Sequence, residues 1–427
     1  MSPVRIAARD WPSEMAEPQP IDSLDLYPLA WDKPDFAADP YSQFEAARKM
    51  HPWLAKTNGG YVVFDLAAIR DLLVKDDLLR TSFDGVVALM SAHGTKWGRF
   101  AEEQMIALPE REHGLLRQTF AARFTPRNAN LLRPIMRAEM QRLLGEWVPK
   151  GRIDFEEFAS YYPVAVMTRM IGAPMAAIPA LRSAMETLGL AFSMDSSLLP
   201  ALDEAMTRFD LFVEQLVADR RAKPHAGGDS QRDLLDLMIE AGEDGGITQR
   251  QLADLLIFLF VAGYDTSKNV LTYLMHLLTR HPEVYERCGK DMAYCQKVVE
   301  EGLRIFTPSS TFRATKQDIV YRDVLIPAGT MLFFALNVAA RICGDMDDPE
   351  AFDPERKVPA NLRHVGFGLG KHMCLGQYIA RAQLQEGLHL IAQQMRHPRE
   401  TAEPGWRPFP GAWGIKGLPL EFEPALG

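Results

Sequence analysis

The chain has little cysteine, with 4 residues among 427. So few cysteines do not make a disulfide framework, and they predict a protein of a reducing compartment, which we take to be the cytoplasm. A run of about 18 apolar residues is missing, and so is an early apolar stretch of signal-peptide length, so we expect no membrane anchor. The net charge of −9 argues against nucleic acid as a partner.

The chain does have an ordinary globular composition and long helical patterns. It is 47% hydrophobic and 24% charged. Helical periodicity dominates residues 111–306 and returns over 374–395, whereas residues 50–65 and 311–335 show the alternation and turn residues of strands. These patterns predict a mainly α protein with small β-sheets.

Two segments lack regular periodicity. Residues 1–35 are rich in proline, and we expect them to form a loosely packed N-terminal arm before a single domain over residues 36–427. Residues 77–110 carry scattered glycines and apolar residues, which predicts a long irregular loop. Loops of that length in compact domains are usually functional or mobile.

Residues 367–376 read Phe-Gly-Leu-Gly-Lys-His-Met-Cys-Leu-Gly and carry the strongest functional signal. They place the thiol of Cys374 after a glycine-rich turn and before a helical stretch, where the helix dipole and unpaired N–H groups favour thiolate over thiol. Phe367 can shield one side of the sulfur, and the glycines let the backbone approach a flat ligand closely. The arrangement suits a sulfur anion held on a metal, and haem iron is the obvious candidate.

Other interpretations of Cys374 compete with this one. A free cysteine is most often a small buried hydrophobic residue, and composition alone favours that role. The dinucleotide fingerprint fails because Met373 stands where a third glycine is needed, and zinc binding fails because no second cysteine is close in sequence. A catalytic Cys-His pair stays open by spacing, although a cysteine protease gives no reason for Phe-Gly-x-Gly.

A proline-free helical pattern runs over residues 248–281 and reads Ala-Gly-Tyr-Asp-Thr at 262–266. The step from Ala262 to Gly263 would let a flat ligand lie against the helix, which would explain a glycine that costs about 1 kcal/mol there. The hydroxyl of Thr266 can bond back to a carbonyl one turn earlier, and Asp265 supplies a group that exchanges protons. The alternative is a mid-helix glycine beside a solvated aspartate and a back-bonded threonine.

Two charged pairs also share helix faces. Glu301 and Arg304 stand three residues apart, and His113 and Arg117 stand four apart, so each pair lies on one face of its helix. Such pairs are commonly solvated and contribute little. Glu300 competes with Glu301, but only Glu301 has an arginine three residues later.

The Cys374 segment resembles the haem-binding signature of the cytochrome P450 family, Phe-Gly-x-Gly-x-His-x-Cys-x-Gly in its usual bacterial form, with every fixed position filled. The resemblance covers roughly residues 35–425. It implies a triangular prism of helices with small sheets and a long central helix over the haem. It also implies a monooxygenase that uses dioxygen and two electrons to hydroxylate a hydrophobic small molecule.

The resemblance assigns a role to each motif. Cys374 becomes the metal ligand of haem b, and Asp265 with Thr266 become the acid and the alcohol that deliver protons during dioxygen activation. The implied haem-binding residues, several of them propionate anchors, are His113, Arg117, Arg313, Phe367, His372, Ala262 and Gly263. The implied substrate pocket includes Phe83, Val87, Met90, Phe192, Val261, Ser309 and Trp413.

The resemblance also implies a structural network and external partners. Glu301 and Arg304 would be joined by Arg356 in a buried network that fixes the cysteine segment. With no flavin or iron–sulfur module in the chain, electrons would come to this monomer from a ferredoxin and its reductase. An acidic ferredoxin would dock on a basic face near Lys371 and the helix that bears Arg117.

Two alternatives within haem chemistry stay open. A peroxide-driven haem peroxygenase would use hydrogen peroxide directly, but such enzymes typically lack the acid–alcohol pair that Asp265 and Thr266 supply. A non-catalytic haem-binding protein would store or sense a ligand without turning it over.

Overall fold

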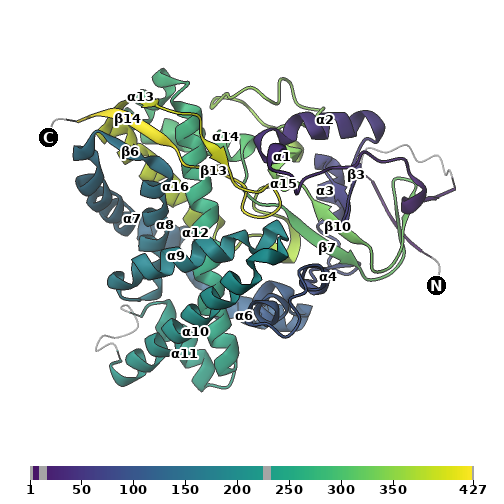
Figure 1. The fold of residues 1–427 in the computed structure, drawn as a ribbon, viewed down its shortest axis with the longest axis horizontal. Helices are drawn as coiled ribbons and strands as arrows, with labels where there is room; N and C mark the ends of the chain where they lie inside the picture. The colour runs from purple at the N-terminus through teal and green to yellow at the C-terminus, as the bar shows by residue number, and fades with distance from the viewer. Residues whose placement is uncertain (1–2, 9–16, 225–231, 426–427) are drawn as a thin grey trace. The chain divides into compact units, whose positions relative to one another are not determined.

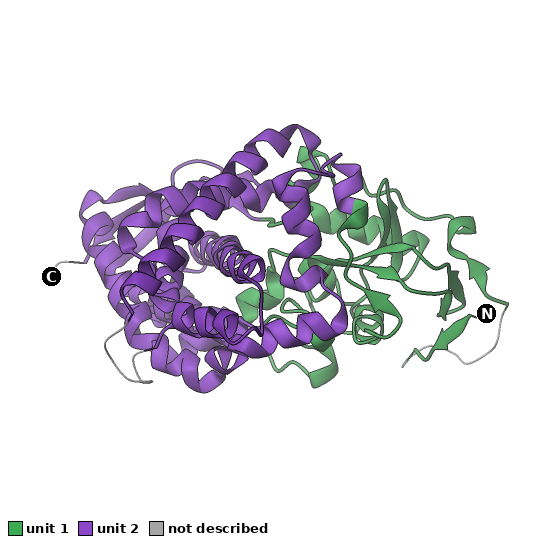
Figure 2. Ribbon diagram, turned by 90° about the horizontal axis from the view of Figure 1, so that it is seen from below, with its two compact units in different colours: residues 1–85, 300–374, 408–413 green, residues 86–299, 375–407, 414–427 purple. Residues whose placement is uncertain are grey.

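The computed structural model describes residues 3–8, 17–224 and 232–425. Within them the predicted class, mainly α with small β-sheets, is confirmed (Figure 1). The chain forms two compact units, each assembled from separated segments (Figure 2). Unit 1 consists of residues 1–85, 300–374 and 408–413, and unit 2 of residues 86–299, 375–407 and 414–427.

Unit 1 is built on two small sheets and a few short helices. Its strands are β1 (Val4–Ile6), β2 (Gln19–Pro20), β3 (Leu54–Thr57), β4 (Gly60–Val63), β5 (Leu79–Arg80), β7 (Thr311–Thr315), β8 (Ile319–Tyr321), β9 (Val324–Ile326) and β10 (Met331–Phe334). The larger sheet has the order β3-β4-β10-β7-β5, and the smaller has the order β1-β8-β9-β2. Its helices are α1 (Pro34–Ala38), α2 (Pro40–Met50), α3 (Leu66–Leu72) and α15 (Leu336–Ala339).

The hairpin predicted within residues 50–65 is confirmed as β3 and β4, paired from Leu54–Val63 to Thr57–Gly60. Gly60 has a φ of 144°, and a Cβ atom there would lie 2.5 Å from the carbonyl oxygen of Met331. The position therefore requires glycine for two reasons. Its φ is one that other residues rarely adopt, and the backbone of β10, which pairs in parallel with β4, lies too close for a side chain.

The expectation of a loosely packed arm over residues 1–35 is wrong for the described part of that segment. β1 pairs in parallel with β8, and β2 pairs in parallel with β9. The side chains of Ile21 and Trp31 are 2% and 3% exposed. The prediction failed because these two short strands are stabilised by partners far along the chain, which no local pattern reveals.

Unit 2 is mostly helical. Its helices are α5 (Lys96–Glu103), α6 (Glu110–Ala121), α7 (Pro126–Trp147), α8 (Phe155–Ile171), α9 (Ile178–Gly189), α10 (Leu199–Ala222), α11 (Leu234–Glu243), α12 (Gln249–Leu278), α13 (Pro282–Lys290) and α16 (Gln377–Gln394). Two further helices, α4 (Asp84–Leu89) and α14 (Met292–Ile305), straddle the boundaries between segments of the two units. The short strands are β6 (Arg152–Asp154), β11 (Met395–Glu400), β12 (Gly405–Trp406), β13 (Ile415–Lys416) and β14 (Pro419–Pro424).

The helical stretches predicted over 111–306 and 374–395 are confirmed, although α16 begins at Gln377 rather than at the cysteine. The irregular loop predicted over 77–110 is wrong, because β5, α4, α5 and the short 3-10 turn Met105–Ala107 together occupy most of it. Arg99 of α5 donates to both carboxylate oxygens of Asp254 in α12, over 3.0 and 3.1 Å. A short helix anchored by a distant carboxylate has too few turns for its periodicity to stand out.

The long helix α12 organises unit 2. It begins with a capping box in which Thr248 and Gln251 satisfy each other's backbone N–H groups. At 1.5 Å per residue its 30 residues span about 45 Å. It packs against α8, α9, α10 and α16, so most of its circumference is buried. Among the described residues, no helix combines the length and the apolar character that crossing a membrane requires.

Candidate active site

The segment that carries Cys374 in unit 1 is a closed turn. The N–H of Cys374 donates to the carbonyl of Phe367 over 2.7 Å, and the N–H of Gly368 donates to the carbonyl of Val365 over 2.7 Å. Gly368 and Gly370 have φ values of 70° and 69°, which other residues adopt only with strain. The sequence thus bends the backbone back on itself directly ahead of the sulfur.

Cys374 is exposed, whereas Cys288, Cys295 and Cys343 are buried. Burial raises the pKa of the Cys343 thiol, as expected for an inert thiol in an apolar setting. The interpretation of Cys374 as a small buried hydrophobic residue is therefore wrong. Among the described residues no three His, Cys, Asp or Glu side chains gather closely enough to hold a metal ion.

Arg313 in β7 gives independent support for an anionic ligand. Its guanidinium donates to Thr311 Oγ1 over 3.0 Å and to the carbonyl of Phe312 over 2.8 Å, and the residue is 4% exposed. Burial lowers its pKa to about 10, and the charge of Asp76 offsets this only in part. No ion pair with a carboxylate is found for Arg313 in the described part of the chain. A buried cation of this kind fits a carboxylate such as a haem propionate.

The other predicted propionate anchors lie on separate elements. His113 on α6 is 2% exposed, and Arg117 lies one turn later on the same helix and is partly exposed. His372 is half-buried in the cysteine turn of unit 1. Each side chain is thus positioned by regular structure, and the convergence of all of them on one ligand stays a prediction.

The Glu301–Arg304 pair is buried, not solvated. Arg304 donates to the two carboxylate oxygens of Glu301 over 2.7 and 2.8 Å, and the side chains are 2% and 5% exposed. Bidentate pairing of this kind is strong and fixes geometry. Arg304 also donates to the backbone carbonyls of Ala340, Pro349 and Ala351.

Arg356 completes the network as the sequence predicts. Its guanidinium lies 3.5 Å from a Glu301 oxygen and donates to the carbonyls of Asp348 and Ala351 over 2.8 and 3.0 Å. Glu300, the competing candidate, has a side chain that is 44% exposed. The network therefore fastens residues 347–356 to helix α14, within the same unit as the cysteine turn.

Residues 262–266 lie in the middle of α12. The hydroxyl of Thr266 donates to the carbonyl of Ala262 over 3.0 Å, as the sequence predicts, and Ala262 is exposed. A Cβ atom on Gly263 would lie 2.9 Å from Met167 Cε, so the close approach at this glycine is made by the flexible end of a side chain of α8. Asp265 is 3% exposed, so the alternative of a solvated aspartate is wrong.

Asp265 belongs to a buried charge cluster, formed by Asp265, Lys268, Glu156 and Arg407, that sequence reasoning missed. Lys268 is 0% exposed, and its Nζ lies 2.8 Å from Asp265 Oδ1 and 3.4 Å from Glu156 Oε1. Arg407 donates to the same Glu156 oxygen over 2.5 Å, and the N–H of Gly417 donates to the other over 2.8 Å. Burial by itself would raise the pKa of Glu156. The charges of Lys268 and Arg407 outweigh this effect, so the pKa of Glu156 is lowered. The spacing Asp-x-x-Lys on a helix was the available signal.

The predicted pocket residues are mostly packed. Phe83, Val87, Met90 and Trp413 are 2%, 0%, 0% and 1% exposed, and the indole of Trp413 donates to the carbonyl of Ala37 over 2.9 Å. Val261 and Ser309 are partly exposed. Phe192 lies in the turn Leu190–Ser193, and its side chain is outside the described residues. That these residues line a substrate pocket stays a prediction.

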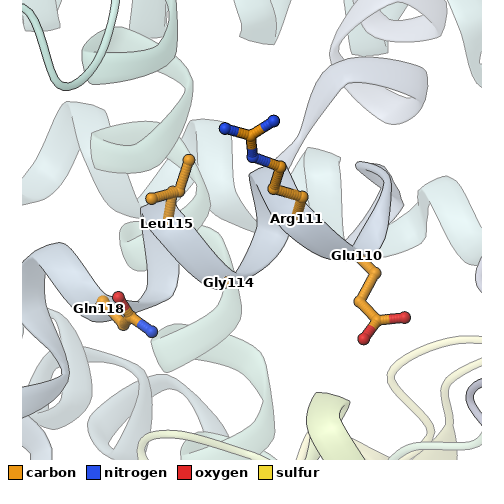
Figure 3. Close-up of a pocket in the computed structure, with 5 residues that line it drawn as sticks. All are labelled: Glu110, Arg111, Gly114, Leu115 and Gln118. Carbon is orange, nitrogen blue, oxygen red and sulfur yellow. The ribbon is translucent and has the colours of Figure 1, made fainter.

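The outer face of α6 is hollowed at the surface of unit 2. Figure 3 shows the residues that line this hollow, which are Glu110, Arg111, Gly114, Leu115 and Gln118. Leu115 is 54% exposed, whereas His113 on the opposite side of the helix is buried. The helix therefore presents an accessible, partly apolar face with both a basic and an acidic residue.

Comparisons with known proteins agree with this geometry. A family model described as Cytochrome P450 matches residues 183–405. Luteothin monooxygenase of Streptomyces thioluteus is 29% identical over 402 residues, covering 92% of this chain and 94% of the relative. Cytochrome P450 monooxygenase PikC of Streptomyces venezuelae is 26% identical over 402 residues, covering 91% and 92%. The solved structure of epothilone B-bound cytochrome P450epoK is similar in fold, with a TM-score of 0.82 at 20% identity over 93% of this chain and 100% of that one.

Proposed function

The chain belongs to the cytochrome P450 family, and we propose that it hydroxylates a hydrophobic small molecule with electrons supplied by a ferredoxin. Members of this family are oxidoreductases that bind haem b, and this chain is a haem-dependent monooxygenase. Haem b, when bound, supplies an iron centre at which dioxygen is reductively activated. The observation that carries the proposal is the exposed thiol of Cys374, held in a turn closed by its hydrogen bond to Phe367.

In this proposal Cys374 would hold the haem iron through its sulfur, and Phe367 would shield that sulfur. Arg313 pairs with a propionate, which its burial without a carboxylate partner in the described chain supports. The remaining proposed contacts of the haem are His113, Arg117 and His372 at the propionates, and Ala262 and Gly263 along α12.

Asp265 and Thr266 are proposed to move protons to the reacting oxygen. Thr266 lies on the accessible part of α12, and its hydroxyl is held by the carbonyl of Ala262 over 3.0 Å, which fixes its orientation. Asp265 is adjacent in sequence and is held in an ion pair with Lys268. An acid–alcohol pair of this kind also argues against a peroxide-driven enzyme, because such enzymes typically lack it.

The ligand assignment is tested by replacing the thiol. With the holoprotein reduced under carbon monoxide, we expect the red-shifted Soret band typical of thiolate-ligated haem, because an anionic sulfur donates electron density to the iron. Cys374→Ala is expected to lose this band, and Cys343→Ala, which alters a buried thiol, is expected to keep it. A normal band in Cys374→Ala would refute the assignment.

The reaction class is tested by turnover. Substrates are first identified by the spectral shift from low to high spin across a panel of apolar compounds. Product formation with a surrogate ferredoxin, its reductase and dioxygen is expected to exceed that with hydrogen peroxide alone. Turnover with peroxide only would indicate a peroxygenase, and ligand binding without any turnover would indicate a non-catalytic haem protein.

A further inference from the structure

We propose that Tyr162, Gln383 and Glu386 form a buried polar site that binds one ordered water molecule between helices α8 and α16. The site lies wholly within unit 2 and goes beyond the proposed reaction, in which none of these residues takes part. Its ligand is a small neutral molecule that both donates and accepts hydrogen bonds. The bound water joins α8 to α16, the helix that follows the cysteine turn.

The first support is that complementary groups are buried without partners where α8 meets α16. The hydroxyl of Tyr162 and Glu386 Oε2 have no hydrogen-bond partner among the described residues, although the two residues are only 1% and 2% exposed. Gln383 Nε2 is a third buried atom of this kind. A buried polar group without a partner carries the whole cost of its lost hydration. Native proteins commonly remove this cost with an internal water.

The second support is that these groups lie close together. A Cβ atom on Gly387 would lie 2.8 Å from Tyr162 Cε1, so the tyrosine ring rests against the backbone of α16 directly beside Glu386. Gln383 stands three residues before Glu386 and therefore lies on the same face of that helix. The site thus combines a phenol hydroxyl from α8 with an amide and a carboxylate from α16.

The surrounding charges favour a neutral ligand over an ion. Arg133 and Arg137 of α7 donate to the other carboxylate oxygen of Glu386, Oε1, over 2.9 and 3.1 Å. Two guanidinium groups beside one carboxylate leave an excess of positive charge, which disfavours a cation next to Oε2. The carboxylate itself disfavours an anion at the same place. Water satisfies the site without adding a charge.

The protonation of Tyr162 sets the direction of the hydrogen bonds. Burial, followed by the charge of Glu386, raises the pKa of Tyr162 well above its ordinary value, so the phenol keeps its proton and donates. Tyr162 and Gln383 Nε2 donate to the water, and the water donates to Glu386 Oε2. The water then has three hydrogen bonds, which is the usual number for a buried water.

Crystallography of the holoenzyme, at a resolution that shows ordered waters, tests the site directly. We expect an electron-density peak within about 3.2 Å of both Tyr162 Oη and Glu386 Oε2. In Tyr162→Phe this peak is expected to disappear or to move away from position 162, because one of its three partners is gone. Tyr161→Phe makes the same change at the preceding residue of α8, and this matched control is expected to keep the peak.

Unfolding in urea gives a second reading. In Glu386→Gln the amide oxygen must take the place of Oε1 to accept from Arg133 and Arg137, which puts an NH2 group at the position of Oε2. Tyr162, Gln383 and this amide then all offer protons to one water, which cannot accept all three. We therefore expect Tyr162→Phe to lower the urea midpoint by less in the Glu386→Gln background than in the wild type.

The proposal is overturned if the crystal shows a direct hydrogen bond between Tyr162 and Glu386, no peak at the site, or a peak with the ligand distances of a metal ion. An equal effect of Tyr162→Phe in the two backgrounds also overturns it, because a shared water must couple the two residues. If Glu386→Gln does not accumulate as folded protein, the crystal structures of the wild type and Tyr162→Phe decide. Neither reading depends on turnover, so this outcome is separate from that of the proposed function.

Discussion

At the scale of single residues, His51 shows how one backbone contact sets a charge state. The N–H of Leu54 donates to His51 Nδ1 over 3.1 Å, so this ring nitrogen acts as an acceptor and carries no proton. Burial, followed by the charge of Arg322, lowers the pKa of His51 from 6.5 to about 4. The ring is therefore neutral in the folded protein over most of the physiological range.

His51 makes the stability of the protein depend on pH in a defined direction. The unfolded chain binds a proton at His51 near pH 6.5, but the folded protein binds it only near pH 4, so stability falls as the pH drops between these values. His51→Asn keeps an acceptor for Leu54 but does not titrate. We expect its loss of stability between pH 7 and about 4.5 to be smaller than that of the wild type, measured from urea unfolding midpoints. Equal losses in both proteins would contradict the assignment.

At the scale of elements, the network of Glu301, Arg304 and Arg356 fastens an irregular segment to α14. Glu301→Gln removes the charge that the buried Arg304 and the partly exposed Arg356 share. Breaking a buried pair such as Glu301–Arg304 destabilises by about 3–5 kcal/mol. We expect a loss of this size in the free energy of unfolding, together with reduced haem content. Glu300→Gln, at the exposed neighbouring position, is the control and is expected to stay within about 0.5 kcal/mol of wild type. Similar losses in both variants would show that the network is not the cause.

The elements that could be predicted from the sequence are those with a local signal. The hairpin of β3 and β4, the cap of α12 at Thr248 and the turn before Cys374 each depend on residues close together in the chain. β1 and β2 could not be predicted, because their partners β8 and β9 come hundreds of residues later. The charge cluster could not be predicted for the same reason. Glu156 and Arg407 are far from Lys268 in sequence and join its cluster only in the folded unit.

At the scale of the whole molecule, the net charge of −9 bears on the choice of electron donor. The ferredoxin that we propose as donor is itself acidic and would be repelled by this net charge, so we expect its docking to depend on exposed basic residues such as Arg111 on α6 and Lys371. We expect the KM for ferredoxin to rise several-fold with salt between low and physiological ionic strength, because screening weakens such contacts.

Variants that each remove one arginine test where on the protein this salt-dependent docking takes place. Arg111→Ala is expected to raise the KM for ferredoxin at low salt and to weaken its salt dependence, with little change in kcat. Arg208→Ala, which removes an exposed arginine from α10, is the control and is expected to behave as the wild type. A KM that does not respond to salt would exclude electrostatic docking.

The division of unit 1 into three separated segments governs how the polypeptide can fold during synthesis. β4 can pair with its neighbour β10 only after the whole segment from α5 to α14 has been synthesised. Trp413, which packs against Phe306 and Phe409, is synthesised later still. Until then the β4 edge of the nascent hairpin has no strand partner, and unpaired strand edges of this kind are prone to aggregation. A chain that stops before residue 408 would leave unit 1 without this segment, so we expect even a late nonsense mutation to destabilise the unit that carries Cys374.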